Sequence, residues 1–109
     1  MKRWSVRDRS GHEIYLTEER WEHVMSRHRE LASRLNDVLD TIRLGRRQQE
    51  QRDPQTYKYY RRYDDLPVPF NHIIVIVAFY FQALPDGRTT SNNFVVSAWG
   101  KYLPTRDIR

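Results

Sequence analysis

Several residue types and patterns are missing from this 109-residue chain. It has no cysteine, which excludes disulfides, thiolate metal sites and a cysteine nucleophile. Its four scattered glycines form no phosphate-binding loop, and no G-x-S-x-G nucleophile motif is present. The longest apolar run, residues 73–81, is far shorter than the ~20 residues of a membrane-spanning helix, and the first residues lack the apolar stretch of a secretory signal. We therefore expect one cytoplasmic domain, residues 1–109, that does not contact a membrane.

Positive charge dominates what is present, and nearly all of it is arginine. The net charge is +5, and sixteen of the nineteen basic residues are arginine. Seven tyrosines and three tryptophans accompany them. Arginine binds phosphate through two parallel hydrogen bonds, and both arginine and aromatic rings stack on bases. The composition therefore favours contact with single-stranded nucleic acid, although an arginine-rich codon bias would give the same composition.

The first half of the chain carries a hairpin signal followed by two helix signals. Residues 3–16 alternate polar and apolar side chains around Gly11, which is typical of a hairpin. Thr17 is a good N-cap for a first helix, whose apolar face includes Trp21 and Val24. A second helix is expected over residues 31–44, where Gly45 ends it.

The second half of the chain is predicted to form strands. Residues 46–54 suit an edge strand or a loop, residues 56–63 alternate, and residues 72–81 are apolar on both faces. An Asp86–Gly87 turn leads to a returning strand over residues 93–103, and short links force antiparallel pairing. We predict an α+β fold in which an N-terminal β-hairpin and two helices pack on one face of a twisted antiparallel sheet of about four strands. Residues 104–109 are expected to be a loose tail.

Two of the four histidines lie on the first predicted helix. His23 and His28 point about 140° apart around that helix, so they cannot share a metal ion, and we expect neither a metal nor another cofactor. His28 falls on the apolar face, where it is either a packed structural group or a catalyst. His23 lies on the flank beside Arg20 and Arg27, where it is either a solvated surface group or a catalyst.

The predicted sheet offers a second group of candidate residues. Arg61 and Arg62 follow three tyrosines, and Ser97 shares one face of the last strand with Trp99. If residues 72–81 lie between these strands, Arg61, Ser97 and Trp99 could converge on one surface. The alternative is that they form the ordinary polar outer face of an alternating sheet.

A family resemblance covers these residues. The hairpin has the form D-x-x-G-x-x-I-x-L-T and leads into ERWEHVMSRHRE, residues 19–30, while the last strand contains FVVSAW. This resembles the phage- and mobile-element-associated branch of the Barnase–EndoU–colicin–RelE (BECR) superfamily of small nucleases. The specific part spans about 24 residues at the N-terminal end, and the rest matches by pattern. The sequence departs from the motif in two places. Arg29 replaces a proline, and this replacement would extend the helix by a turn. Ser97 and Trp99 replace the commoner threonine and tyrosine.

The resemblance implies two helices on a four-stranded antiparallel sheet and metal-independent cleavage of RNA. The matching polar residues are His23, Arg27 and His28 of the helix motif, Tyr59 and Arg61 of the middle strand, and Ser97 of the last strand.

A mechanism with these residues needs few parts, because RNA supplies its own 2′-hydroxyl nucleophile. His23 or His28 would be the acid or base, Arg27 and Arg61 would hold the phosphate, and Ser97 would donate a hydrogen bond. The residues expected to bind substrate, the tyrosine and tryptophan rings by stacking on bases, are Arg20, Tyr57, Tyr59, Arg62 and Trp99.

Two other functions fit the same sequence. One is a non-catalytic RNA-binding module. The other is a toxin-like protein whose basic face binds an acidic antitoxin.

Overall fold

The computed structural model describes residues 2–104, so residues 105–109 of the expected tail lie outside it. Within that range the chain forms six strands, two α-helices and one short 3-10 helix. The elements are β1 Arg3–Arg7, β2 Glu13–Thr17, α1 Glu18–Arg27, η1 Arg29–Leu31, α2 Leu35–Leu44, β3 Arg46–Gln49, β4 Thr56–Arg62, β5 His72–Ala83 and β6 Thr89–Lys101.

The strands form one mixed sheet in the order β1-β2-β6-β5-β4-β3. Strands β3 to β6 are antiparallel, as predicted, whereas β2 runs parallel to β6 and pairs with it only through Tyr15 and Phe94. The α+β class and the two helices are confirmed. The expected sheet of about four strands is wrong, because the N-terminal hairpin joins the sheet through β2 and brings it to six.

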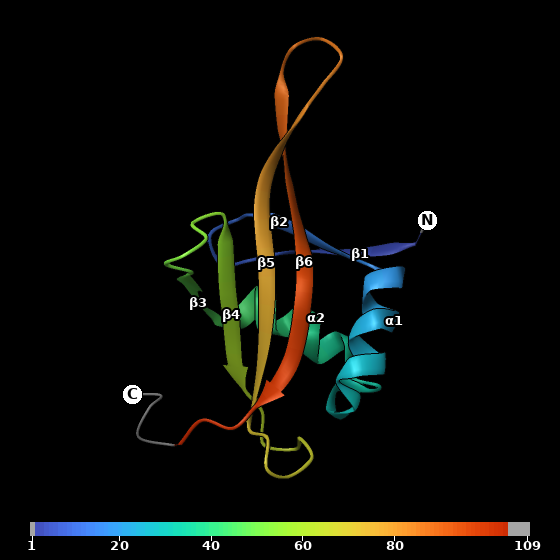
Figure 1. Ribbon diagram of the computed structural model, residues 1–109, viewed down its shortest axis with the longest axis vertical. Coiled ribbons are helices and arrows are strands. Elements are labelled where there is room, and N and C mark those ends of the chain that lie inside the picture. Colours follow the sequence, from blue (N-terminus) through green and yellow to red (C-terminus); the bar gives the residue numbers. More distant parts are fainter. Residues whose placement is uncertain (1, 105–109) are drawn as a thin grey trace.

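The helices lie on one side of the sheet. In Figure 1, α2 crosses behind the sheet and α1 lies beside β6, so no helix of residues 2–104 covers the front of β3 to β6. The core fills the space behind the sheet, with Ile73, Val75 and Val77 of β5 facing Val38 and Ile42 of α2. Each such buried aliphatic side chain contributes about 1.5–3 kcal/mol.

The region between the helices differs from the prediction. Thr17 caps α1 as expected, with its Oγ1 accepting a hydrogen bond from the Arg20 N–H at 3.1 Å. The helix ends at Arg27, and His28 leaves it with φ −130° and ψ 77°. Arg29 therefore does not extend α1 by a turn. The second helix begins at Leu35 instead of residue 31, since η1 and a left-handed Ser33 (φ 65°) precede it.

Strands β5 and β6 continue past their neighbours as a two-stranded arm (Figure 1). The arm turns at Asp86–Gly87, as the sequence predicts, and Gly87 has the positive φ of 87° that such a turn requires. Residues 46–49 form the edge strand β3, one of the two alternatives that the sequence left open.

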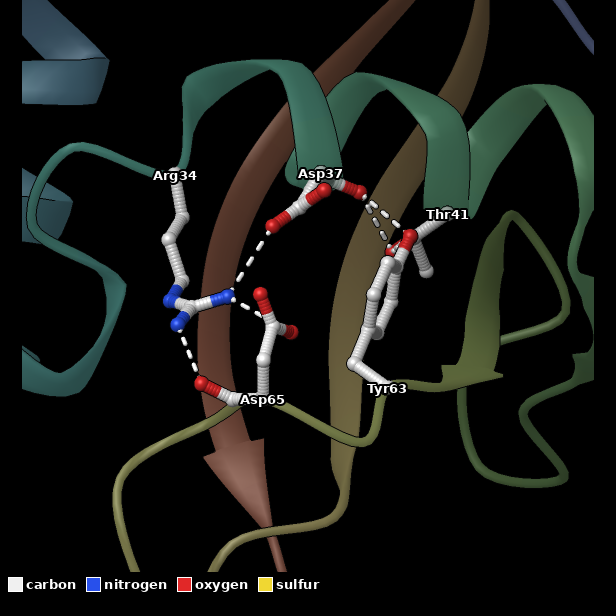
Figure 2. A network of polar contacts seen from close by, with 5 residues as sticks. All are labelled: Arg34, Asp37, Thr41, Tyr63 and Asp65. Atoms are coloured by element: carbon white, nitrogen blue, oxygen red, sulfur yellow. Dashed lines mark hydrogen bonds and ion pairs between the residues drawn. The ribbon is translucent and has the colours of Figure 1, made fainter.

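A polar network joins α2 to the connection after β4 (Figure 2). The Tyr63 hydroxyl lies 2.8 Å from the Asp37 carbonyl oxygen and 3.0 Å from the Thr41 hydroxyl. The Arg34 guanidinium donates to the carboxylates of Asp37 and Asp65, each at 3.1 Å. The network thereby fixes the end of β4 against α2.

Removing the Tyr63 hydroxyl should weaken the attachment of the end of β4 to α2. We expect Tyr63→Phe to lower the free energy of unfolding by about 1 kcal/mol, because one buried hydrogen-bonding group is lost. The melting temperature should fall by roughly 4–8 °C, measured by circular dichroism. Tyr102→Phe, at an exposed position, is the matched control. Equal melting temperatures for the two variants would contradict this role of the network.

Candidate nucleic-acid interface

Three rows of side chains cross the face of β3 to β6 that no described helix covers, and we call this the open face. Residues paired across neighbouring strands point to the same side of a sheet, so the strand register defines each row. From β6 to β3 the rows are Lys101–His72–Arg62, Trp99–Ile74–Tyr60–Arg46 and Ser97–Ile76–Lys58–Gln48.

The open face is positively charged. Its rows contain Arg46, Lys58, Arg62 and Lys101 and no carboxylate. Arg62 forms an ion pair with Asp64 at 3.2 Å, but the Asp64 side chain is 87% exposed, and such pairs contribute little. Among residues 2–104 no acidic group forms an ion pair with the other three cations. Their charge is therefore free to attract an anion.

A shallow hollow lies over the middle of the open face. Its volume is about 260 Å³, and its lining includes Lys58, Tyr60, Ile74, Trp99 and Lys101. Tyr60 and Trp99 stand on either side of Ile74 in one row. Rings next to cations are the groups that stack on bases while binding the phosphate backbone.

His28 lies at the β6 edge of the open face. Its ring centroid is 6.3 Å from that of Trp99, and its Nδ1 is 3.8 Å from the Glu30 carboxylate. Glu30 in turn accepts a hydrogen bond from the Gly100 N–H at 2.7 Å, which attaches this segment to β6. The His28 side chain is 33% exposed, so the ring is partly packed and still accessible to solvent.

The expected convergence of Arg61 with Ser97 and Trp99 is wrong. Arg61 pairs with Ile73, which pairs with Gly100, and this row faces the helices. The Arg61 guanidinium lies over the Tyr63 ring, 5.0 Å from its centroid. Because side chains alternate along β4, Arg62 is the arginine that points to the open face, together with Ser97 and Trp99.

The two tyrosines expected to stack on bases also face the helices. Tyr59 is only 1% exposed and belongs to the core, so it cannot stack on a base. The Tyr57 ring lies 5.1 Å from Phe79 and 4.4 Å from the Arg47 guanidinium, on that same side. The predicted alternation along β4 is confirmed, but of the four residues selected there only Arg62 lies on the open face. Tyr60, which it did not select, is the tyrosine on the open face.

The candidates on α1 form a separate group beside β6. Arg20 lines a hollow of about 200 Å³ with Tyr15, Phe94 and Val96. Arg27 follows Arg20 by two helical turns and His23 by one, and all three side chains are exposed. No hydrogen bond or ion pair between described residues joins His23 or Arg27 to the open face.

The sequence analysis did not select His72, which lies between Lys101 and Arg62 in the first row. Asn71 Oδ1 accepts from the Leu103 N–H at 2.9 Å and lies 2.8 Å from His72 Nδ1, so Nδ1 carries the proton and Nε2 keeps its lone pair. Burial, and secondarily the charge of Arg62, lowers the pKa of His72. The ring is thus neutral near pH 7. The sequence signal that could have identified His72 is its spacing from Ile74 and Ile76, which places the three side chains on one face of the strand.

A second polar cluster lies on the helix side, where the tip of the β1–β2 hairpin meets β4. The Asp8 carboxylate, 2% exposed, accepts from the Tyr59 hydroxyl at 2.5 Å and from the N–H groups of Ser10 and His12. His12 Nδ1 is 3.1 Å from the same carboxylate. Burial alone would raise the pKa of Asp8, but the hydrogen bonds from Tyr59 and His12 outweigh it and hold this pKa below the usual 3.8. Asp8 is therefore ionised at neutral pH and anchors the hairpin tip to β4.

The depressed pKa of Asp8 predicts how stability depends on pH. The stabilisation it provides is present above pH 3.8, the ordinary value for the group, and is lost as the pH falls below that value. We expect Asp8→Asn to lower the free energy of unfolding at pH 7 by about 1–3 kcal/mol. The difference in the free energy of unfolding between wild type and Asp8→Asn, measured by urea denaturation, should become smaller below pH 4. A difference in the free energy of unfolding that stays constant down to pH 2.5 would contradict the stabilising role of the ionised Asp8 carboxylate.

Comparison with known proteins gives no relative: no protein-family model matches the chain, and no curated protein or solved structure is significantly similar to it. None of the helices in residues 2–104 is long and apolar enough to cross a membrane. Over the same residues, no three His, Asp or Glu side chains gather as a metal site would require.

Proposed function

We propose that this chain is a metal-independent endoribonuclease that holds single-stranded or structured RNA on its open face. The observation that carries the proposal is the composition of that face. Four cations and two accessible rings share a helix-free surface with no carboxylate, and a histidine stands at its edge. The resemblance of the N-terminal motif to the BECR nucleases favours the same activity. In that case the helices lie on one face of the sheet and the RNA on the other.

The chemistry requires one base, one acid and one cation. The RNA 2′-oxygen attacks the adjacent phosphorus and loses its proton to the base. The 5′-oxygen leaves and takes a proton from the acid, which yields a 2′,3′-cyclic phosphate and a 5′-hydroxyl end. His28 is the better placed shuttle, because its ring is reachable at the edge of the open face beside Trp99. The unprotonated Nε2 of His72 is the second candidate.

The remaining groups have simpler roles. Lys58, Arg62 and Lys101 stabilise the extra negative charge of the phosphorane, and the Ser97 hydroxyl donates a hydrogen bond. Tyr60 and Trp99 stack on bases. Arg20, His23 and Arg27 form a basic flank beside β6, and His23 is the alternative to His28 as the acid or base.

Cleavage of RNA in EDTA tests this proposal. Wild type should release products with 2′,3′-cyclic phosphate ends, and His28→Ala should slow cleavage by about 10²–10⁴ with the melting temperature nearly unchanged. His23→Ala, on the exposed side of α1, is the matched control and should retain activity. If His23→Ala loses activity and His28→Ala keeps it, the roles of the two histidines are exchanged. Absence of cyclic phosphate ends from the wild-type reaction would contradict the nuclease.

A non-catalytic RNA-binding module is the second candidate. The limited exposure of the two histidines near the open face, 33% for the His28 side chain and 2% for His72, favours it. A binder would give no products, and its affinity would fall steeply with salt as phosphate contacts release counterions.

An acidic protein partner would use the same cations. It would compete with RNA for the open face.

A further inference from the structure

We propose that a second anion site lies at the β3–β4 edge of the sheet and binds a chain of two or three phosphates. We call it the edge pocket. It is a hollow of about 340 Å³ whose lining includes Arg9, Arg46, Tyr60, Arg61, Arg62 and His72. The phosphates could belong to the 5′ end of an RNA or to a free nucleotide. The RNA case rests on the proposed function, whereas the phosphate site itself does not.

The edge pocket exists because β3 is shorter than β4. Strand β3 begins at Arg46, opposite Tyr60, so the edge of β4 beyond Tyr60 has no neighbouring strand among residues 2–104. Arg61 and Arg62 point to opposite faces of β4, yet at an open edge both side chains can reach the same hollow. This explains why two consecutive arginines serve one site.

Arg9 reaches the edge pocket from a distant part of the sequence. It is an exposed residue of the β1–β2 turn and directly follows Asp8. Asp8 is bound to the Tyr59 hydroxyl of β4 and lies 4.0 Å from Arg47 of β3. The buried Asp8 carboxylate therefore holds the turn against β3 and β4 and keeps Arg9 beside the other arginines.

The turn from α2 into β3 also depends on close packing against β4. A Cβ on Gly45 would lie 2.6 Å from the Tyr60 carbonyl oxygen and would also clash with the Thr41 carbonyl. Only glycine lets the chain pass this close and start β3 at Arg46. Gly45 itself lines the edge pocket, so part of its wall is bare backbone.

The charge of the edge pocket is not neutralised by the protein. Among the described residues, no carboxylate forms an ion pair with Arg9, Arg46 or Arg61, and the Asp64 partner of Arg62 is exposed. Asp37 and Asp40 favour the charge of Arg61 from a distance, but they form ion pairs with Arg34 and Arg43. Asp8, which lines a neighbouring hollow together with Arg9 and Arg46, already accepts four hydrogen bonds. Three of the four guanidinium groups around this hollow thus have no ion-pair partner among the described residues, and the fourth has only an exposed one, so an anion would supply the missing counter-charge.

The size and position of the edge pocket indicate the class of ligand. Its volume corresponds to roughly ten water molecules at about 30 Å³ each, more than a single phosphate would fill. Arginine binds phosphate oxygens in pairs, so four arginines suit several linked phosphates. The β3 edge is about 14 Å from β6, three interstrand spacings, so an RNA with its 5′ phosphates in the edge pocket could continue across the open face.

Calorimetry with inorganic tripolyphosphate tests the site independently of cleavage. Wild type should bind it at least about tenfold more tightly than inorganic monophosphate. Arg9→Gln and Arg61→Gln should each weaken tripolyphosphate binding roughly tenfold. Arg88→Gln, which removes the same charge at the tip of the β5–β6 arm, should not. Arg9 is exposed in a turn, so its substitution leaves the fold intact. Equal binding by the Arg9→Gln and Arg88→Gln variants, or no binding by wild type, would overturn the proposal.

Two further binding measurements identify the source of the phosphates. An RNA with a 5′-triphosphate should bind wild type more tightly than the same RNA with a 5′-hydroxyl, and Arg9→Gln should remove that preference. If ATP binds as tightly as the triphosphorylated RNA, the ligand is a free nucleotide. Trp99→Ala should weaken binding of the RNA but leave tripolyphosphate binding unchanged. The measurements therefore distinguish a failure of the proposed RNA binding by the open face from a failure of the proposed phosphate binding by the edge pocket.

Discussion

The alternation of side chains along β4, fixed by its pairing with β5, decides which residues face the core and which face solvent. Tyr57, Tyr59 and Arg61 point towards the helices, and Lys58 and Tyr60 point away from them. A shift of one residue in this register would bury a lysine and expose the core tyrosine. The register is set by the apolar side chains of β5, which fill the space in front of α2. The positive open face is thus a consequence of how the core is packed.

The hydrogen bond between Tyr59 and Asp8 extends this constraint to the N-terminal hairpin. It joins residues 51 positions apart and attaches the hairpin tip to the middle of β4. Along β2, Tyr15 pairs with Phe94 of β6, and the Asn93 side chain of β6 donates a hydrogen bond to the Glu13 carbonyl oxygen at 3.0 Å. The hairpin is therefore held at two distant points, and its turn delivers Arg9 to the edge of the sheet. One buried carboxylate supports both the six-stranded sheet and the arginine cluster of the edge pocket.

Much of the fold could be predicted from local sequence signals. The Thr17 cap, the strand periodicities and the Asp86–Gly87 turn are each set by residues close in sequence, and the structure has all of them. The early start of the second helix was wrong, because the left-handed Ser33 interrupts an otherwise helical pattern. Attachment of the hairpin to the sheet depends on contacts between distant residues and leaves no local signal.

The candidate site was harder to predict for a related reason. Both faces of β4 carry rings and cations, so composition alone does not say which face is covered. The prediction chose Tyr59 and Arg61, which face the helices, and Arg62, which lies on the open face; Tyr60 of that face was not selected. His28 and Trp99 were both selected and do lie together, 6.3 Å apart, because the end of α1 meets the edge of β6. His72 and Arg46 were missed, since their importance follows from strand pairing alone.

The salt dependence of RNA binding tests most directly whether RNA lies on the open face. The double variant Lys58→Gln, Lys101→Gln removes two cations of that face, and Arg43→Gln, Arg88→Gln removes two cations elsewhere. For single-stranded RNA, the slope of log affinity against log salt is negative, and each lost phosphate contact reduces its magnitude by about 0.7. If RNA lies on the open face, the magnitude of the slope should fall by about 1.4 in the first variant and stay unchanged in the second. Equal slopes in the two variants would contradict binding of RNA to this face.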